Sequence, residues 1–431
     1  MSSGTTRAAP GRSTGILPVR RAGVSPAESA ASRAKTRRDA RSPHSRDGRA
    51  PTPPLPVIGI EAEFTLFIDD VKRRPEQVFG TPAKLIGQPM IPRTGRSFQL
   101  PSGGAIYFDT GVIEVATPIV ELQPGCAYRA TRLLWEQIRY VRRELDEWSA
   151  RRGVRARLQG FSTHYNFSFP DARKSRTRTS HKLARLLAHI LPAPVALLAA
   201  NRKSGAIGVR PRGTRVEVTA DFTPDAALML ATCGFITGAV ETILHWDNFQ
   251  PEQLVQHGIP QPVPLRLRKH TSRKGWRVVP SSLQHNPFTC DPNAAIWNLR
   301  DGRVESLRAI AAETLRPFRK EVRRLSDADT LKHIEAVFAG DARSLLDFPD
   351  CPAAYDDAGH GIDWNRRRVR HWRRSDYEQV IHRVIARKPI RIGGKRYLVQ
   401  RMQGWYEIVF REEKSGTRRV FNLDELVRLA K

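Results

Sequence analysis

The chain has 431 residues, of which 40% are hydrophobic and 27% charged, so it can bury a large core in a main domain with a smaller one attached. Its formal net charge of +29 favours polyanionic partners such as nucleic acid, nucleotides or acidic peptides, and names no reaction. We find no apolar run long enough to predict a membrane span, and the four scattered cysteines without a C-x-x-C pair predict a cytoplasmic protein without a disulfide framework or zinc knuckle.

The N-terminal segment, residues 1–55, is rich in Ala, Arg, Ser, Pro and Gly and poor in aromatic residues. Residues 1–50 carry eleven Lys and Arg against three Asp and Glu, a net charge of +8, which leaves +21 for residues 51–431. This composition predicts a disordered basic tail. Most of the positive charge is therefore expected on the folded part.

Regular elements are predicted over residues 57–250. Strands are predicted where apolar and polar side chains alternate, over 57–68, within 104–116, and over 157–169 and 213–221. Helices are predicted where apolar residues recur at helical spacing, over 128–150, over 181–200 with a break near Pro192 and Pro194, and over 225–246 with a start at Asp225.

The sequence changes character after about residue 250. Residues 250–300 are rich in Pro, His and Asn and predict long loops, while helices are predicted at 303–325 and 327–339. The segment 340–365 predicts another loop. Residues 366–431 begin with a very basic helical pattern and continue into two hairpins turned at Gly-Gly and Ser-Gly. We interpret them as a small basic β-rich module that binds an acidic partner.

The predicted strands share an unusual distribution of polar side chains. In the first strand, Glu61 and Glu63 lie on one face and the apolar residues on the other. In the strand over 157–169, His164, Asn166 and Ser168 share one face, and in the strand over 213–221 Arg215 and Glu217 do. Within 104–116, Asp109 and Glu114 lie on either side of a bend at Gly111. A solvated face in so basic a protein should also carry lysine, and none of these strands does.

Carboxylates, an imidazole and arginines on one sheet face are the groups that bind divalent cations and phosphates. Each motif alone has a simpler interpretation: Glu61 and Glu63 as a wet strand face, His164 as a hydrogen-bonded core histidine, and residues 210–215 as a basic loop. Because the strands agree in phase, we predict a combined metal and phosphate site.

Four stretches resemble, in order, motifs of the glutamine synthetase-like carboxylate–amine ligases, especially the branch of glutamate–cysteine ligase and the Pup ligase. GIEAEF (59–64) resembles the first strand of that branch, and FDTGVIEVATP (108–118) a Pup-ligase stretch. GFSTHYNFS (160–168) is similar to a motif of eukaryotic glutamine synthetases, and RPRGTRVEV (210–218) to the strand with a phosphate-binding arginine and a metal-binding glutamate. We find no family motif beyond about residue 250.

The resemblance implies an α+β catalytic domain over residues 56–345, built on a curved antiparallel sheet with helices packed on one face. It implies ATP with Mg²⁺ or Mn²⁺, and phosphoryl transfer to a carboxylate that gives an acyl phosphate for an amine to attack. The implied metal ligands are Glu61, Glu63, Glu114, Glu217 and His164. The implied nucleotide and phosphate contacts are His164, Asn166, Ser168, Arg210, Arg212 and Arg215, and the implied base that deprotonates the amine is Asp109.

Two other functions stay open. A nucleic-acid-binding protein would explain the charge and the run RRRVRHWRR (366–374), but not the glutamates, which repel phosphates unless a cation is bound. A hydrolase of amide or isopeptide bonds would use the same metal site. The sequence does not identify the carboxylate and amine substrates, which are small molecules or peptides. It does not identify the oligomeric state either.

Overall fold

A computed structural model describes residues 55–169, 178–212, 215–270, 275–348 and 374–429, which belong to one compact unit of the chain. Almost all of the predicted tail 1–55 and of the basic run 366–374 lies outside the described residues. The predictions of disorder for the tail and of a helix over that run therefore stay predictions.

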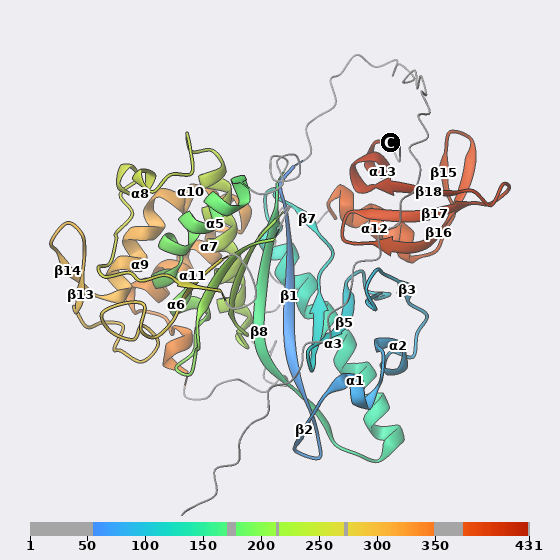
Figure 1. Ribbon diagram of the computed structural model, residues 1–431, viewed down its shortest axis with the longest axis horizontal. Coiled ribbons are helices and arrows are strands. Elements are labelled where there is room, and N and C mark those ends of the chain that lie inside the picture. Colours follow the sequence, from blue (N-terminus) through green and yellow to red (C-terminus); the bar gives the residue numbers. More distant parts are fainter. Residues whose placement is uncertain (1–54, 170–177, 213–214, 271–274, 349–373, 430–431) are drawn as a thin grey trace, which may run out of the picture. The chain divides into compact units, whose positions relative to one another are not determined.

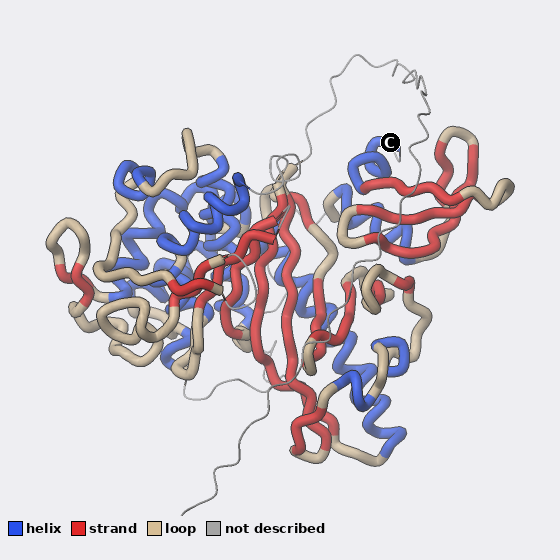
Figure 2. The backbone as a smooth tube through the Cα atoms, viewed as in Figure 1, coloured by secondary structure: helices blue, strands red, loops and turns tan. Residues whose placement is uncertain are grey.

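The centre of the fold is a 12-stranded antiparallel sheet, in which β1 and β8 run side by side (Figures 1 and 2). The strand order along it is β11-β12-β9-β10-β8-β1-β6-β5-β4-β3, and β2 and β7 also pair with β1. The strands are β1 (Val57–Ile68), β2 (Val71–Arg73), β3 (Ile91–Pro92), β4 (Phe98–Gln99), β5 (Ala105–Asp109), β6 (Val112–Ala116), β7 (Val120–Glu121), β8 (Ala156–Ser168), β9 (Ile207–Arg212), β10 (Arg215–Asp221), β11 (Arg268–Lys269) and β12 (Trp276–Val278).

Helices pack on the apolar face of this sheet, as predicted. Ile60, Tyr165 and Val218 point from three neighbouring strands into a core that they share with the helices, and all three are fully buried. The helices are α1 (Pro75–Val78), α2 (Pro82–Leu85), α3 (Cys126–Arg152), α5 (Arg178–Ile190), α6 (Pro192–Ala199), α7 (Ala226–Leu244), α8 (Glu252–Gln256), α9 (Leu307–Leu315), α10 (Arg319–Leu325) and α11 (Ala328–Ala339). The sequence pattern therefore gave the layer order correctly, because each strand has one apolar face.

Helix α7 corrects the expectation that no apolar run is long enough to cross a membrane. Its 19 residues are long and apolar enough by length and composition, and so is the bent pair Thr179–Ile190 and Pro192–Ala199 taken together. Most of α7 is buried inside the fold, where the helix packs against α3, α10 and α11. Its apolar surface is thus already used as core. Its start at Asp225 is as predicted, since that side chain accepts a hydrogen bond from the Leu228 amide.

Three segments differ in detail from the sequence interpretation. The stretch around Arg210 and Arg212 belongs to strand β9, which pairs with β10 over residues 208–212, so its alternative interpretation as a basic loop is wrong. The helix predicted over 303–325 is interrupted by the 3₁₀ turn Arg316–Phe318, where Pro317 removes a backbone donor. The loop region predicted at 250–300 contains short elements, including β13 (Trp297–Asn298). This strand pairs with β14 (Val304–Glu305), so the helix predicted from 303 begins only at Leu307.

A β-bulge in β8 lies beside the polar face. Ser162 is opposite Glu63, but Gly160 is opposite Phe64, so Phe161 is an extra residue. In a regular strand Gly160 and Ser162, two residues apart, would share a face, whereas the bulge turns Gly160 to the core and Ser162 to the polar side. A Cβ on residue 160 would lie 2.1 Å from the Phe222 ring, so this position needs glycine. The bulge thus keeps both halves of the longest strand in the correct phase.

The C-terminal module is a four-stranded antiparallel sheet with two helices, and it is β-rich as predicted. Its hairpins turn at Gly393-Gly394 and at Gly416, all with positive φ. Its elements are α12 (Asp376–Ile385), β15 (Ile390–Ile392), β16 (Lys395–Gln403), β17 (Glu407–Glu412), β18 (Arg418–Asn422) and α13 (Leu423–Leu429).

The module is joined to the main sheet by shared core and buried polar contacts. Its hydrophobic cluster includes Val57 and Ile119 of the main domain. The backbone amide of Tyr377, in the first turn of α12, donates to Glu121 at 2.9 Å. The two parts, predicted as 56–345 and 366–431, are therefore in direct contact.

Candidate active site

The strand registers place the predicted site residues in rows that cross the sheet. Directly opposed residues of antiparallel strands point to the same face. Three such rows are Tyr107–Glu114–Glu63–Ser162–Asp221, then Glu61–His164–Thr219, then Asn166–Glu217–Arg210. The four glutamates predicted to share a face, Glu61, Glu63, Glu114 and Glu217, therefore do so, on the face opposite the helix-packed core.

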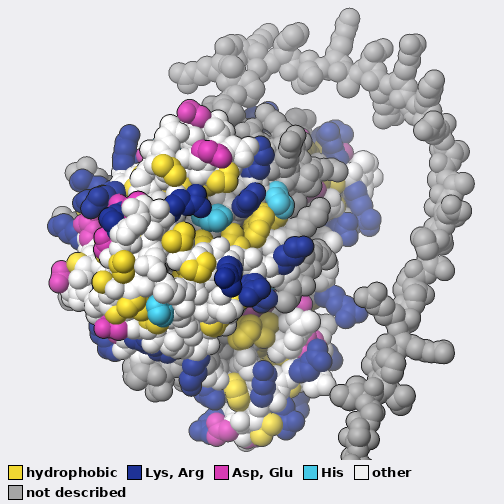
Figure 3. Space-filling view, turned by 60° about the vertical axis from the view of Figure 1, so that its left-hand side comes forward, with side chains coloured by type: hydrophobic (Ala, Val, Ile, Leu, Met, Phe, Trp, Pro, Cys, Tyr) yellow, Lys and Arg dark blue, Asp and Glu magenta, His cyan; other side chains and the backbone are white. Residues whose placement is uncertain are grey.

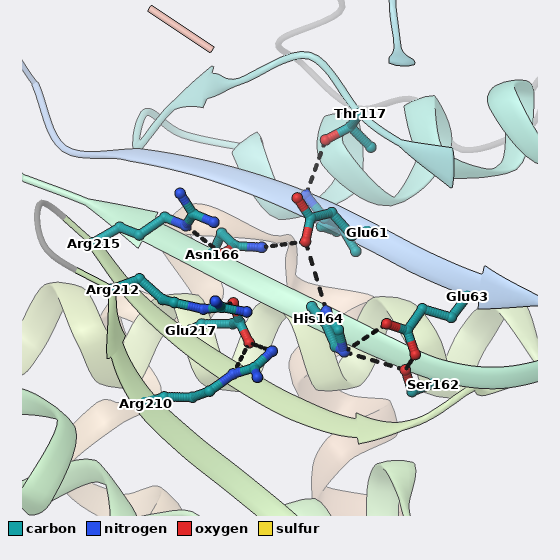
Figure 4. A network of polar contacts seen from close by, with 11 residues as sticks. Glu61, Glu63, Thr117, Ser162, His164, Asn166, Arg210, Arg212, Arg215 and Glu217 are labelled. Atoms are coloured by element: carbon teal, nitrogen blue, oxygen red, sulfur yellow. Dashed lines mark hydrogen bonds and ion pairs between the residues drawn. The ribbon is translucent and has the colours of Figure 1, made fainter. Parts of the chain in front are cut away.

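His164 joins two of these glutamates (Figure 4). Its Nδ1 atom lies 3.6 Å from a Glu61 oxygen and its Nε2 atom 3.6 Å from a Glu63 oxygen. The Ser162 hydroxyl donates to Glu63 at 2.5 Å and lies 3.2 Å from His164 Nε2. Burial opposes the charged imidazole, but Glu61, Glu63 and Glu217 together raise the pKa of His164 above its ordinary value. The histidine is thus held between carboxylates and favoured in its charged form.

Glu114 lies on the other side of Glu63, directly opposite it on β6. Burial, followed by repulsion from the Glu63 carboxylate, raises the pKa of Glu114 to about 8, although a hydrogen bond with Tyr107 lowers it. Tyr107 hydrogen-bonds to both Glu61 and Glu114, and burial together with these two carboxylates raises its own pKa. In the absence of a cation, Glu114 therefore keeps a proton at neutral pH.

The arginines lie on the opposite flank of the same face (Figure 4). Glu217 is fully buried, and its carboxylate contacts both Arg210 and Arg212, the latter at 2.9 Å. Arg215 donates from Nε to Asn166 Oδ1 at 2.8 Å, and the Asn166 amide donates to Glu61 at 3.2 Å. Two of the three arginines predicted to bind phosphate are thus paired with a glutamate predicted to bind metal.

Asp109 and Ser168 lie at the margins of the site. Asp109 ends β5, two residues from Tyr107 and on the same face, beside the turn at Thr110. It is exposed, so its predicted role as a base would depend on neighbouring carboxylates and not on burial. Ser168 lies opposite Val57 and Arg215, and it lines the pocket described below.

The donor set suits a hard divalent cation. Among the described residues, no three His, Cys, Asp or Glu side chains already converge on one point where a metal ion could bind. Nevertheless, carboxylates of Glu61, Glu63 and Glu114 with the His164 imidazole are the ligand types that Mg²⁺ and Mn²⁺ use. A cation would also relieve the repulsion that raises the pKa of Glu114. Glu217 fits this role least, because two arginines already neutralise it.

A pocket of about 460 Å³ opens beside these groups. The main sheet contributes Glu61, Asn166 and Arg215 to its wall, and the turn between β16 and β17 contributes Trp405 and Tyr406. Arg93 holds that turn: its guanidinium lies 4.0 Å from the centre of the Trp405 ring, and it donates to the Gly404 carbonyl at 2.9 Å.

Five residues at the site and its pocket were not predicted from the sequence: Tyr107, Ser162, Arg93, Trp405 and Tyr406. A signal existed for Tyr107 and Ser162, because each alternates in phase with a residue that was chosen, Asp109 and His164 respectively. No local signal existed for Arg93 or for the two aromatic residues, which the chain brings in from far along the sequence.

Comparisons with known proteins give little beyond this geometry. No protein-family model matches the chain, and no curated protein matches it. Among solved structures, the chain is similar to the crystal structure of the complex between the prokaryotic ubiquitin-like protein Pup and its ligase PafA. That likeness has 11% sequence identity and a TM-score of 0.49, and it covers 86% of this chain and 89% of that chain. A likeness of this degree carries no argument about function.

The pKa of Glu114 predicts a pH-dependent stability in metal-free buffer. Since this pKa rises from 4.5 to about 8 on folding, the folded protein binds more protons than the unfolded chain between these values. The free energy of unfolding should therefore fall as pH rises through this window, by on the order of a few kcal/mol. Glu114→Gln should make this decline shallower, as measured by denaturant unfolding from pH 5 to 9, and the part due to the raised pKa of His164 should remain. Glu252→Gln, an exposed control, should follow the parent, and parallel profiles for all three proteins would refute the prediction.

Proposed function

We propose that this protein is an ATP- and Mg²⁺-dependent carboxylate–amine ligase that works through an acyl phosphate. The observation that carries the proposal is the cluster of Glu61, Glu63 and Glu114 around His164 on one sheet face, with Arg215 beside it. Such a cluster repels phosphates unless a cation is bound, and with a cation it suits a nucleotide triphosphate. A ligase of the glutamine synthetase-like class needs both properties, and it is the class that the four sequence motifs resemble.

The roles follow from the contacts. Glu61, Glu63, Glu114 and His164 would hold the metal, which when bound neutralises charge on the triphosphate. Arg215, positioned by Asn166, would bind the transferred phosphoryl group with its guanidinium fork. The pair of Arg210 and Arg212 with Glu217 would keep this edge of the sheet rigid beneath it. Asp109, exposed at the end of β5, would accept a proton from the incoming amine.

The pocket beside Glu61 suits the base of the nucleotide. Its volume of about 460 Å³ lies in the range of ligand sites, and it joins two aromatic side chains to the polar cluster. This location would give the C-terminal module a part in binding ATP. The resemblance alone implies nucleotide contacts only from residues of the main domain.

Trp405→Ala should therefore weaken ATP binding and leave the chemical step nearly intact. Loss of one aromatic surface against a base should raise the KM for ATP roughly 10-fold with little change in kcat. Trp405→Phe keeps a ring and serves as the matched variant, which should lie close to the parent. Steady-state kinetics with varied ATP measures both constants. A lower kcat at unchanged KM would remove Trp405 from the ATP site.

The outward face of the C-terminal sheet supports an acidic partner for this module. Arg391 lies directly opposite Arg396, and Arg411 directly opposite Arg418, and all four side chains are exposed. Arg396 also pairs with Glu413 at 3.0 Å, which leaves Arg391, Arg411 and Arg418 as the larger part of this charge. Like charges in directly opposed positions destabilise a sheet, so this pattern suits a surface that meets negative charge. In this proposal the acidic partner is the substrate that supplies the carboxylate.

The function is tested by incubating the protein with ATP, Mg²⁺ and pools of amines and carboxylates. A ligase releases ADP in proportion to the amide formed, and release stops when either substrate is withheld. Amide cleavage without steady ADP release would instead identify a hydrolase. Nucleic acid binding without any ATP turnover would identify a nucleic-acid-binding protein and refute the proposal.

A further inference from the structure

We propose a second ligand site, away from the carboxylate cluster, for a small anion with an aromatic body. It lies in the pocket between α5, β12 and the loops that contain Phe249 and Leu265. This inference goes beyond the proposed function and does not depend on it. Figure 3 shows the side of the molecule where hydrophobic, Lys and Arg, and His side chains gather next to one another.

The pocket combines cationic and apolar walls. Its volume is about 490 Å³, and Lys182 and Arg185 of α5 line it together with Leu267 and Trp276. The His181 ring, also in the wall, packs edge-on against Trp276 with the ring centres 4.7 Å apart. This volume is in the range of small-molecule sites, and flat rings with short aliphatic side chains suit an aromatic ligand.

The charge of this pocket is uncompensated within the part of the chain that the structure describes. No Asp or Glu is among the described residues that line it. His189, a further wall residue, shows the effect of the surrounding charge: burial, followed by repulsion from Arg185 and Arg300, lowers the pKa of this histidine to about 4. An anion bound between these groups would relieve the repulsion, and a cation would increase it.

Strand β12 separates this pocket from the candidate active site. Trp276 lies opposite Val209, which belongs to the helix-packed core, while the next residue, Arg277, lies opposite Gly208. Gly208 in turn is opposite Thr219 in the row that contains Glu61 and His164. Successive residues of a strand point to opposite faces, so the pocket is on the reverse face of the sheet. It is therefore a separate site, near the β11–β12 edge of the sheet.

The test uses two fluorescent probes of similar shape, the anionic anilinonaphthalene sulfonate and its uncharged analogue N-phenyl-naphthylamine. The double variant Lys182→Gln/Arg185→Gln removes the positive charge of the pocket without touching its apolar wall. Affinity for the anionic probe should fall at least roughly 10-fold, and affinity for the neutral probe should not change. The control Arg151→Gln/Arg152→Gln, at the exposed end of α3, removes the same charge elsewhere and should leave both affinities unchanged.

A second variant, Leu267→Trp, fills the pocket and should lower the affinity for both probes. This loss would show that both probes bind in the pocket. Equal affinity of the anionic probe for the parent and the charge variant would overturn the proposal, as would equal losses for both probes in that variant. Displacement of the probe by polyglutamate or by an oligonucleotide, but not by naphthoate, would assign the pocket to a polymer and also overturn it.

Discussion

Glu63→Gln should abolish Mg²⁺-dependent ATP turnover and leave the fold intact. Gln keeps nearly the same volume and can still accept the hydrogen bond from Ser162. The change removes one anionic oxygen ligand from the cluster, and metal-assisted charge stabilisation supplies a large share of phosphoryl-transfer catalysis. ADP release should therefore fall by a factor on the order of a thousand or more. Stability without metal should change little at neutral pH, because Glu114 is protonated there and the change also removes the attraction between Glu63 and the charged His164.

The measurement pairs an ADP-release assay with thermal melts in the presence and absence of Mn²⁺ and ATP. Glu136→Gln, on the exposed face of α3, is the control and should behave as the parent in both. If Glu63→Gln turns over at the parent rate and still gains thermal stability from Mn²⁺ and ATP, Glu63 is a solvated strand residue and the ligase proposal loses its main support.

Glu217→Gln should have the opposite signature, a large loss of stability. The Glu217 carboxylate is fully buried between Arg210 and Arg212, so its removal leaves two guanidinium groups without their counter-charge. Breaking a buried ion pair on one side typically costs about 3–5 kcal/mol. Denaturant unfolding should show this loss both with and without Mg²⁺.

A compensating variant separates a structural role of Glu217 from metal binding. Arg210→Met/Glu217→Met removes both sides of the most buried contact and should recover a large part of the lost stability. If Glu217→Gln instead keeps the parent stability and loses its stabilisation by Mn²⁺ and ATP, Glu217 is a metal ligand, as the resemblance to the ligases implies.

The sequence by itself determined which residues share a face of the sheet. Strand alternation is a local property with a period of two, so Glu61, Glu63, His164, Asn166 and Glu217 could be assigned to one side without knowing any neighbour. The long helices were also predictable, because their apolar residues recur with the period of 3.6. The helix over 303–325 was the exception, and Pro317 accounts for it.

Only the tertiary structure decided what each side chain contacts. The register between β9 and β10 decides which of their residues lie opposite each other. This register cannot be read from the alternation within either strand, so the pairing of Arg210 with Glu217 was not visible in the sequence. The position of Trp405 beside Glu61 was not visible either, because the two residues are far apart in the sequence. The same holds for the second pocket, between α5 and β12. Partners so distant in sequence are selected by packing and charge in the folded state, and alternation carries no information about them.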